Sequence, residues 1–109
     1  MNTYVTADTI RKLREGRNLT QAAQAGERGL WNAATLHQQT AAKAWRKSWR
    51  VTAAFADHMP MEDIDSLFAR LPVYAGQEET AEYAAACREL ARRVEAVAEA
   101  HRLTWWNLM

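Results

Sequence analysis

Four basic residues in one short stretch have the spacing of a binding surface for anions. They are Lys43, Arg46, Lys47 and Arg50. These positions are i, i+3, i+4 and i+7, so on a helix they form one stripe along about two turns. No acidic residue lies between Glu27 and Asp57, so the stripe lacks carboxylate partners one helical turn away. A row of unpaired cations suits nucleic-acid phosphates or an acidic protein surface. The alternative is an ordinary solvated helix face.

Five tryptophans are a large number for a chain of 109 residues. We expect Trp31, Trp45 and Trp49 in the core, because Trp45 and Trp49 lie on the side of their helix opposite to the cations. Trp105 and Trp106 are adjacent, so they cannot both face one core on a helix. We expect at least one of them to contact a partner or a second copy. The alternative is that this segment folds back and buries both.

Residues suited to catalysis or metal binding are scattered along the chain. The sequence has no glycine-rich phosphate loop, no zinc-ligand spacing and no nucleophile elbow. Cys87 and His101 are separated by fourteen residues, which on one helix is ~21 Å, too far for a catalytic pair. Glu62, Asp63 and Asp65 are expected to stabilise the N-terminus of a helix. The sequence therefore predicts a protein that is not an enzyme and holds no metal and no cofactor.

The net charge of +1 conceals a division along the chain. Residues 1–50 contain nine basic and three acidic residues, a net charge of +6, whereas residues 51–109 contain five basic and ten acidic residues, a net charge of −5. The division predicts an end that seeks anions and an end with another role. The length predicts a single domain over 1–109, with a basic half at 1–58 and an acidic half at 59–109 that is a possible dimer or partner surface.

The composition also predicts where the protein is located and whether it associates with a membrane. A single cysteine, Cys87, excludes an internal disulfide and makes the cytoplasm the expected location. No apolar stretch reaches the ~18 residues that cross a bilayer, and no signal-peptide pattern opens the sequence. We therefore expect no membrane partner.

The elements that must position these residues are helices. Alanine is abundant, glycine and proline total only six residues, and no stretch alternates with period two, so the sequence predicts an all-α domain of about five helices. It would have a helix-turn-helix-like start, then a long basic helix and a long C-terminal helix. The first helix is expected to start at Thr6 or Asp8 and to end at 15, and the second to start at 20 and to end at Gly26 or Arg28. The other expected spans are 31–58 with a bend near 38–40, 61–71, and 78–104.

The first predicted helix and the short helix at 61–71 carry more detailed expectations. Gly16 is expected to end the first helix and Asn18 to form a turn, with Ile10 and Leu13 facing the core. The short helix at 61–71 should bury four apolar residues, Ile64, Leu67, Phe68 and Leu71.

The last predicted helix carries an apolar seam. It consists of Tyr83, Cys87, Leu90, Val94, Val97 and His101, spaced by 4, 3, 4, 3 and 4 residues, which is coiled-coil spacing. One interpretation packs this seam on the domain's own core. The other uses Tyr83, Leu90, Val94 and Val97 as the contact surface of a dimer or a protein partner.

The N-terminal segment TADTIRKLREGRNLTQAAQAGERGLWNAATLHQ resembles the Cro/repressor-type (Xre-like) helix-turn-helix family of DNA-binding proteins. The opening IRKLREGRNLTQ and the spacing Gln21-x3-Ala25-x3-Gly29 carry the resemblance, which covers the N-terminal third. It implies a close helix approach at Ala25, a left-handed turn at Gly29 and a recognition helix at 32–38 in the major groove. By the same resemblance Gln21 would contact the DNA backbone. The side chains implied to read base edges are Asn32, Thr35, His37 and Gln38.

These observations lead to three functional hypotheses. The first is a small DNA-binding transcriptional regulator that touches phosphates through Arg17, Lys43, Arg46, Lys47 and Arg50, with the acidic half supplying a dimer contact. The second is a protein inhibitor or adaptor from a phage or mobile element, of the anti-defence or anti-CRISPR type, which uses the acidic half and Trp105 and Trp106. Gln24 and Arg28, where the family has core apolar residues, favour this second hypothesis. The third is an antitoxin that binds DNA at the front and a toxin at the back.

Overall fold

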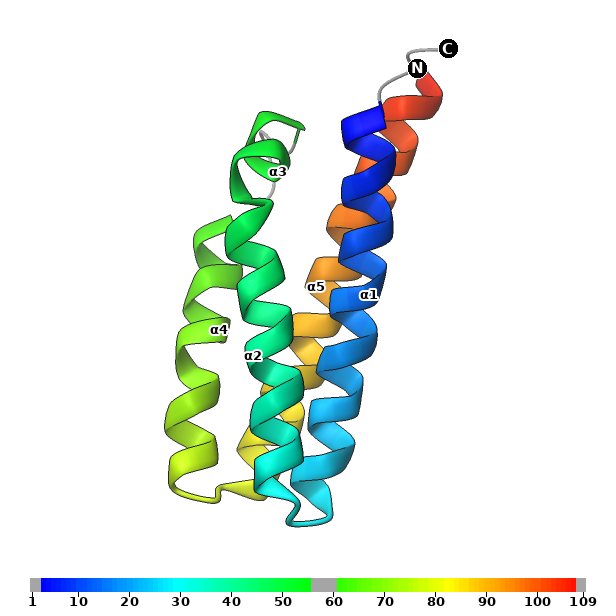
Figure 1. The fold of residues 1–109 in the computed structure, drawn as a ribbon. Helices are drawn as coiled ribbons and strands as arrows, with labels where there is room; N and C mark the ends of the chain where they lie inside the picture. The colour runs from blue at the N-terminus through cyan, green and yellow to red at the C-terminus, as the bar shows by residue number, and fades with distance from the viewer. Residues whose placement is uncertain (1–2, 56–60, 108–109) are drawn as a thin grey trace.

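The chain folds into an elongated antiparallel bundle of helices (Figure 1). The structure is a computed structural model that describes residues 3–55 and 61–107. The helices are α1 (Thr3–Glu27), α2 (Trp31–Lys47), α3 (Trp49–Phe55), α4 (Met61–Gly76) and α5 (Thr80–Asn107). The all-α prediction is confirmed for the described residues, with four long helices and the short α3 that follows α2. α1 packs most extensively on α5 and next on α2, so helices from the basic and the acidic half share one core.

The break predicted near Gly16 and Asn18 is wrong, because α1 is a single helix of 25 residues. Asn18 Nδ2 donates to the carbonyl of Arg14 at 3.2 Å, and Thr20 Oγ1 donates to the carbonyl of Gly16 at 3.0 Å. Both side chains therefore bond backbone one turn back within a continuous helix. Gly16 lies inside this helix and faces α5, where a Cβ would lie 2.8 Å from Oε1 of the exposed Glu95 side chain.

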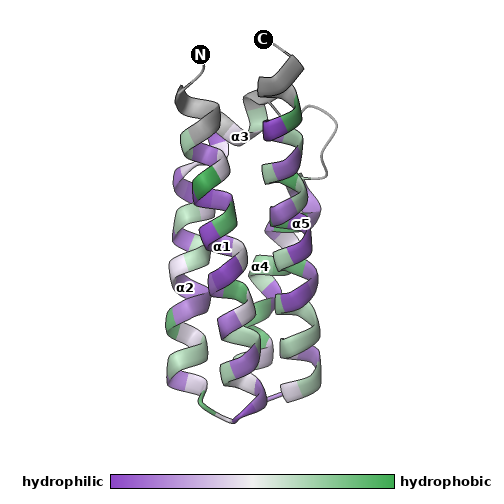
Figure 2. Cartoon of the chain, turned by 90° about the vertical axis from the view of Figure 1, so that its right-hand side faces the viewer, coloured by the Kyte–Doolittle hydropathy of each residue, from purple (hydrophilic) through white to green (hydrophobic). Residues whose placement is uncertain are grey.

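The inward face of α1 also differs from the prediction. Ile10 and Leu13 are 49% and 52% exposed, so their assignment to the core is wrong. The apolar core residues of α1 are Leu19, Ala22, Ala23 and Ala25. Because α1 is one continuous helix, the face that carries these four residues extends toward the N-terminus through polar residues. Ile10 and Leu13 lie outside that face. Figure 2 shows strongly hydrophilic residues recurring along α1 and α5 beside hydrophobic ones.

The second helix ends at Lys47, and the chain bends at Ser48 rather than near 38–40. Trp45 is buried as predicted, and Trp31 is half-buried with its ring edge-on to Tyr83, 5.2 Å between centroids. Trp49 is 39% exposed, so its predicted place in the core is wrong. It is the first residue of α3, and the bend at Ser48 carries it out of the core face that Trp45 occupies.

The second half of the bundle is closer to expectation. Ile64, Phe68 and Leu71 of α4 are buried as predicted, and Leu67 is half-buried. α4 continues past its expected end, through Pro72, to Gly76. α5 starts at Thr80 rather than at residue 78, because Glu78 has a positive φ of 52° in the preceding turn.

The seam of α5 packs inside its own chain. Its six residues, Tyr83, Cys87, Leu90, Val94, Val97 and His101, are buried with at most trace exposure. α1 covers α5 along its length, so the interpretation of the seam as a dimer or partner surface is wrong. Burial also raises the pKa of the Cys87 thiol to about 12, which keeps this free cysteine protonated.

Two glycines of α1 give a matched stability test. Gly16→Ala is expected to stabilise the fold by up to about 1 kcal/mol, because alanine is the better helix former and the exposed end of Glu95 can move aside. Gly26→Ala should instead cost about 1–2 kcal/mol, since its Cβ would lie 2.7 Å from the buried, rigid ring of Tyr83. Urea unfolding of both variants checks the sign of each change. Equal effects of the two substitutions on the free energy of unfolding would contradict the different surroundings of Gly16 and Gly26.

Candidate functional site

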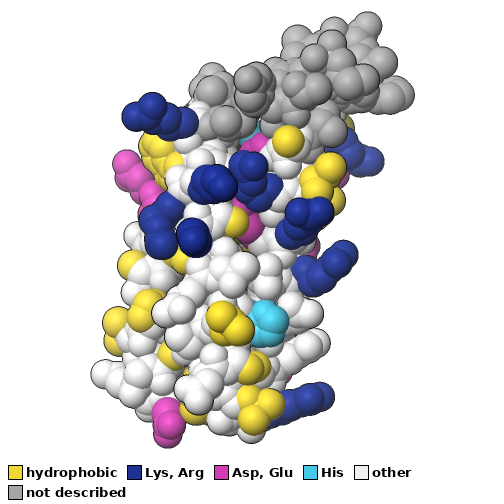
Figure 3. All heavy atoms as spheres, viewed as in Figure 1, with side chains coloured by type: hydrophobic (Ala, Val, Ile, Leu, Met, Phe, Trp, Pro, Cys, Tyr) yellow, Lys and Arg dark blue, Asp and Glu magenta, His cyan; other side chains and the backbone are white. Residues whose placement is uncertain are grey.

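Exposed basic side chains gather on the helices of the N-terminal half. We define the basic face as Arg14, Arg17, Lys43, Arg46, Lys47 and Arg50, all exposed. Figure 3 shows Lys and Arg side chains concentrated over the upper part of the side on which α1 and α2 lie. The first two residues come from α1, the next three from α2, and Arg50 from α3. Because α1 and α2 are neighbours, residues far apart in the sequence contribute to one surface.

The acidic residues of α1–α3 do not neutralise this face. There are three of them within the described part of these helices, and two, Asp8 and Glu15, are buried. The third, Glu27, accepts both guanidinium hydrogen bonds of Arg88 on α5, at 2.6 and 3.0 Å. The described surface of α1–α3 therefore presents cations without a free exposed carboxylate.

The cations of α5 behave differently. Arg88, Arg92, Arg93 and Arg102 each pair with a carboxylate: Glu27, Glu89, Asp63 with Glu89, and Glu99. Within the described residues, none of the six side chains of the basic face has such a partner. The two groups thus differ in their capacity to bind an external anion.

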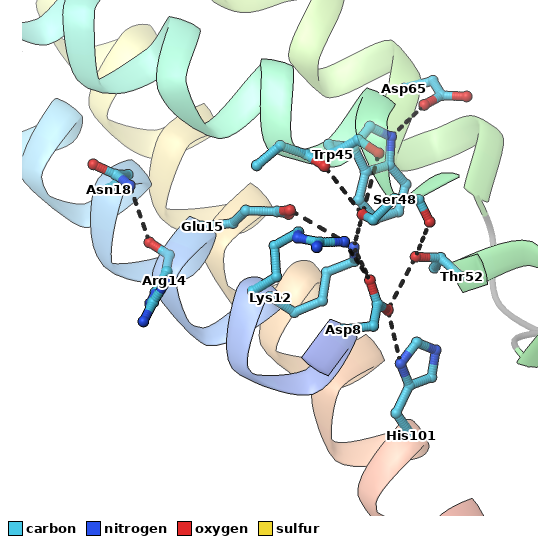
Figure 4. A network of polar contacts seen from close by, with 12 residues as sticks. Asp8, Lys12, Arg14, Glu15, Asn18, Trp45, Ser48, Thr52, Asp65 and His101 are labelled. Atoms are coloured by element: carbon cyan, nitrogen blue, oxygen red, sulfur yellow. Dashed lines mark hydrogen bonds and ion pairs between the residues drawn. The ribbon is translucent and has the colours of Figure 1, made fainter. Parts of the chain in front are cut away.

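Beneath the basic face lies a buried polar cluster centred on Lys12 (Figure 4). Lys12 Nζ lies 3.2 Å from Asp8 Oδ1 and 3.6 Å from Glu15 Oε1, and it donates a short hydrogen bond to Ser48 Oγ. The ammonium also stands 4.9 Å from the ring centroid of Trp45, a cation–π contact. The cluster therefore ties α1 to the bend that follows α2.

Asp8 extends the cluster to α3 and α5. Its Oδ2 accepts a hydrogen bond from Thr52 Oγ1 at 3.2 Å and lies 2.9 Å from His101 Nδ1. Thr52 and His101 are buried. The single carboxylate of Asp8 thus contacts side chains from two other helices, and it fixes the upper end of α1 against α3 and α5.

Lys12 lies between the carboxylates of Asp8 and Glu15, and the pKa values of these two groups shift in opposite directions. Burial opposes the charge of Asp8 most strongly, but the contacts of His101 and Lys12 outweigh it and lower the pKa of Asp8. Burial raises the pKa of Glu15 to about 7, since the charge of Lys12 compensates only in part and Asp8 adds repulsion. Neither oxygen of Glu15 accepts a hydrogen bond within the described residues. Asp8 is therefore the ionised partner of Lys12.

The residues implied to read DNA bases do not share one surface. Asn32 is exposed, whereas His37 is half-buried and its Nδ1 lies 3.2 Å from Asn18 Oδ1. Gln38 is buried and accepts a hydrogen bond from the Tyr83 hydroxyl at 2.9 Å. Its predicted role at base edges is therefore wrong. Thr35 is half-buried and, like Gln38, lines a groove beside α2.

The other positions that carry the resemblance agree only in part with what it implies. Gly29 has φ +73° in the turn between α1 and α2, as the resemblance implied. Gln21 is exposed, and Ala25 is buried. Gln24 and Arg28 are exposed, so they are not polar residues at core positions.

The expected partner surface of the acidic half is not formed by the seam. Tyr83, Leu90, Val94 and Val97 are buried in the core described above. The side chains of Trp105 and Trp106 lie outside the described residues, although the backbone of α5 extends through them.

A groove of about 820 Å³ separates α2 and the start of α3 from α4. Its α2 and α3 wall contains Thr35, Gln38, Gln39, Ala42, Trp45, Arg46 and Trp49, and its α4 wall contains Asp65, Phe68, Ala69, Pro72, Ala75 and Gly76. Arg46 thus belongs both to the basic face and to this groove. No sequence pattern had associated the two walls.

The buried cluster was also missed from the sequence. The available signal was the spacing of Asp8, Lys12 and Glu15, which share one helix face with Leu19. The expected helix end at Gly16 concealed that continuity.

The described residues contain no group of three or more His, Cys, Asp or Glu side chains placed to hold a metal ion. None of their helices combines the length and the apolar character needed to cross a bilayer.

Comparison with known proteins identifies the family. The family model described as a domain of unknown function (DUF4363) matches residues 2–108, and the chain belongs to this family. No curated protein and no solved structure matches the chain.

Proposed function

We propose that this member of the DUF4363 family is a non-enzymatic binding protein that docks on the phosphate backbone of duplex DNA through its basic face. One observation carries the proposal: α1–α3 present exposed cations with no free exposed carboxylate among the described residues, while the arginines of α5 pair internally. Unpaired Lys and Arg side chains bind DNA by releasing the counterions condensed on its phosphates.

The proposed binding is to the backbone rather than to a particular base sequence. Phosphate contacts position a protein, whereas base edges in a groove supply specificity. Gln38 is engaged with Tyr83, and His37 lies beside Asn18, so two of the four implied base-reading side chains are committed within the fold. We therefore expect little sequence preference.

A salt-dependent polarisation assay tests the proposal. Binding to a mixed-sequence duplex is measured at about 50 and 200 mM salt. The triple variant Lys43→Gln, Lys47→Gln, Arg50→Gln is expected to bind at least about tenfold more weakly at the lower salt and to show a salt slope smaller by about 3.

The matched control neutralises three cations elsewhere. Arg70→Gln, Arg92→Gln, Arg102→Gln removes the same charge from α4 and α5 and should retain most of the affinity. The proposal fails if the wild-type chain does not bind at low salt, or if both triple variants lose affinity equally. Equal losses would show that net charge, not the basic face, governs binding.

A second candidate is the protein inhibitor or adaptor. The groove between α2 and α4 favours it, because an exposed Trp49 stands at a largely apolar channel, and exposed aromatic side chains frequently anchor protein contacts. A partner captured by wild type, retained by the basic-face triple variant and lost in Trp49→Ala would support this candidate over DNA binding.

A further inference from the structure

We infer that the groove between α2 and α4 is a binding site for a small apolar monocarboxylate. The inference is independent of DNA binding. The volume of about 820 Å³ falls within the range of small-molecule sites, which are mostly apolar with a few placed polar groups.

The floor of the groove is apolar and ordered. Trp45 and Phe68 stack with ring centroids 6.1 Å apart and an interplanar angle of 29°. Trp45 Nε1 donates to Asp65 Oδ1 at 2.6 Å, which links the two walls and satisfies the buried indole N–H. The floor is thus formed before any ligand arrives.

Small residues create the space above this floor. Ala42 lies on the α2 wall, and Ala69, Ala75 and Gly76 lie on the α4 wall. A Cβ added at Gly76 would meet no atom within 4 Å. This part of the groove is lined by small apolar residues on α4 and by uncharged polar residues on α2, Thr35, Gln38 and Gln39. It carries no charged side chain, which suits the apolar body of a ligand.

The charge on the α2 wall comes from Arg46. Its guanidinium has no carboxylate partner within the described residues, and it lines the groove three residues before the exposed Trp49. Arginine binds a carboxylate by two parallel hydrogen bonds, and an indole provides a flat surface for an apolar group. An anionic head at Arg46 with an apolar body along the groove matches both features.

Asp65 limits the charge of the ligand. It carries its carboxylate on the α4 wall of the same groove, and one of its oxygens is engaged by Trp45. A second negative charge on the ligand would be repelled by Asp65. The site is therefore matched to a carboxylate with one charge rather than to a phosphate monoester.

Fluorescent probes test this inference on the full chain. The aromatic monoanion 8-anilinonaphthalene-1-sulfonate and its uncharged relative N-phenyl-1-naphthylamine are titrated separately. Dodecanoate and dodecyl phosphate then compete with the bound monoanion. We expect dodecanoate to displace the probe and dodecyl phosphate to do so at least about tenfold less well.

Four variants locate the site. Arg46→Gln should weaken the anionic probe about tenfold and leave the neutral probe unchanged, while the control Arg70→Gln, exposed on the same helix as Asp65 and outside the groove lining, should change neither. Ala69→Trp, at an exposed position of the groove, should abolish binding of both probes. Ala69→Leu repeats the test with a smaller side chain if the tryptophan lowers the melting temperature.

Three results would overturn the inference. They are unchanged binding of the monoanion in both Ala69 variants, an equal effect of Arg46→Gln and Arg70→Gln, and equal displacement by dodecanoate and dodecyl phosphate. Absence of probe binding by the wild-type chain would also overturn it and would leave the groove as a contact for a protein helix.

Discussion

Lys12→Met is expected to lower the free energy of unfolding by about 3–5 kcal/mol near neutral pH. Lys12 is fully buried, and its Nζ lies 3.2 Å from Asp8 Oδ1. Methionine fills a similar volume, so the variant removes charge more than packing. It leaves the Asp8 carboxylate buried without the ammonium that favours its ionised form. Urea unfolding followed by circular dichroism measures the change.

A paired variant and a control separate charge from shape. Asp8→Asn combined with Lys12→Met removes both members of the ion pair, and we expect it to recover more than half of the lost stability. Arg14→Met alters an exposed basic residue of the same helix and should change stability by no more than about 0.5 kcal/mol. A cost for Lys12→Met no larger than that of Arg14→Met would show that the cluster does not stabilise the fold.

Packing between helices explains why the extent of α1 was difficult to predict. Gly16 and Asn18 favour a helix end when only their neighbours are considered. The helix continues because Leu19, Ala22 and Ala23 bury their side chains in the core that α1 shares with α5 and α2. Tertiary contacts of this kind leave no local pattern in the sequence.

Polar core residues pose the same difficulty. Lys12 bonds Ser48 across 36 positions and Asp8 bonds Thr52 across 44. A sequence pattern places three charged residues on one helix face, but it does not supply their distant partners. Ile10 and Leu13 therefore looked like the better core candidates, since burying an unpaired charge is costly.

Where periodicity is continuous, prediction succeeded further. The spacing of the α5 seam correctly identified six buried residues, and the apolar positions of α4 were largely correct. The alternation of 4 and 3 residues could not distinguish an intrachain core from a dimer surface, because both bury the same face. In the fold α1 packs over that seam, so the seam belongs to the core of its own chain.

The basic residues of the candidate site could be predicted from the sequence, but their surroundings in the fold could not. The stripe of cations followed from helical spacing, and its four residues are exposed. The absence of competing carboxylates on α1–α3 required the fold, since Asp8 and Glu15 are hidden and Glu27 is occupied by Arg88. The groove required it too, because its two walls come from helices that are separate in the sequence.

Glu15→Gln is expected to stabilise the protein by about 3 kcal/mol at alkaline pH and to have little effect near pH 4.5. The pKa of Glu15 is raised from 4.5 to about 7 in the folded state, a difference that corresponds to about 3 kcal/mol. Between these values the native state holds a proton that the unfolded state releases. The wild-type free energy of unfolding should therefore fall as pH rises from about 4.5 to about 7 and remain low above that range.

Glutamine keeps the shape of the protonated carboxyl and cannot ionise, so this decline should disappear in Glu15→Gln. Asp8 does not confuse the measurement, because its lowered pKa gives a contribution that is lost only on acidification below its ordinary value of 3.8. Urea unfolding at several pH values between about 5 and 8 measures the difference, with Glu95→Gln, an exposed change on α5, as the control. Parallel pH curves for the wild-type and Glu15→Gln chains would mean that Glu15 is not the buried, protonated partner in the cluster, and that Lys12 serves both carboxylates as ions.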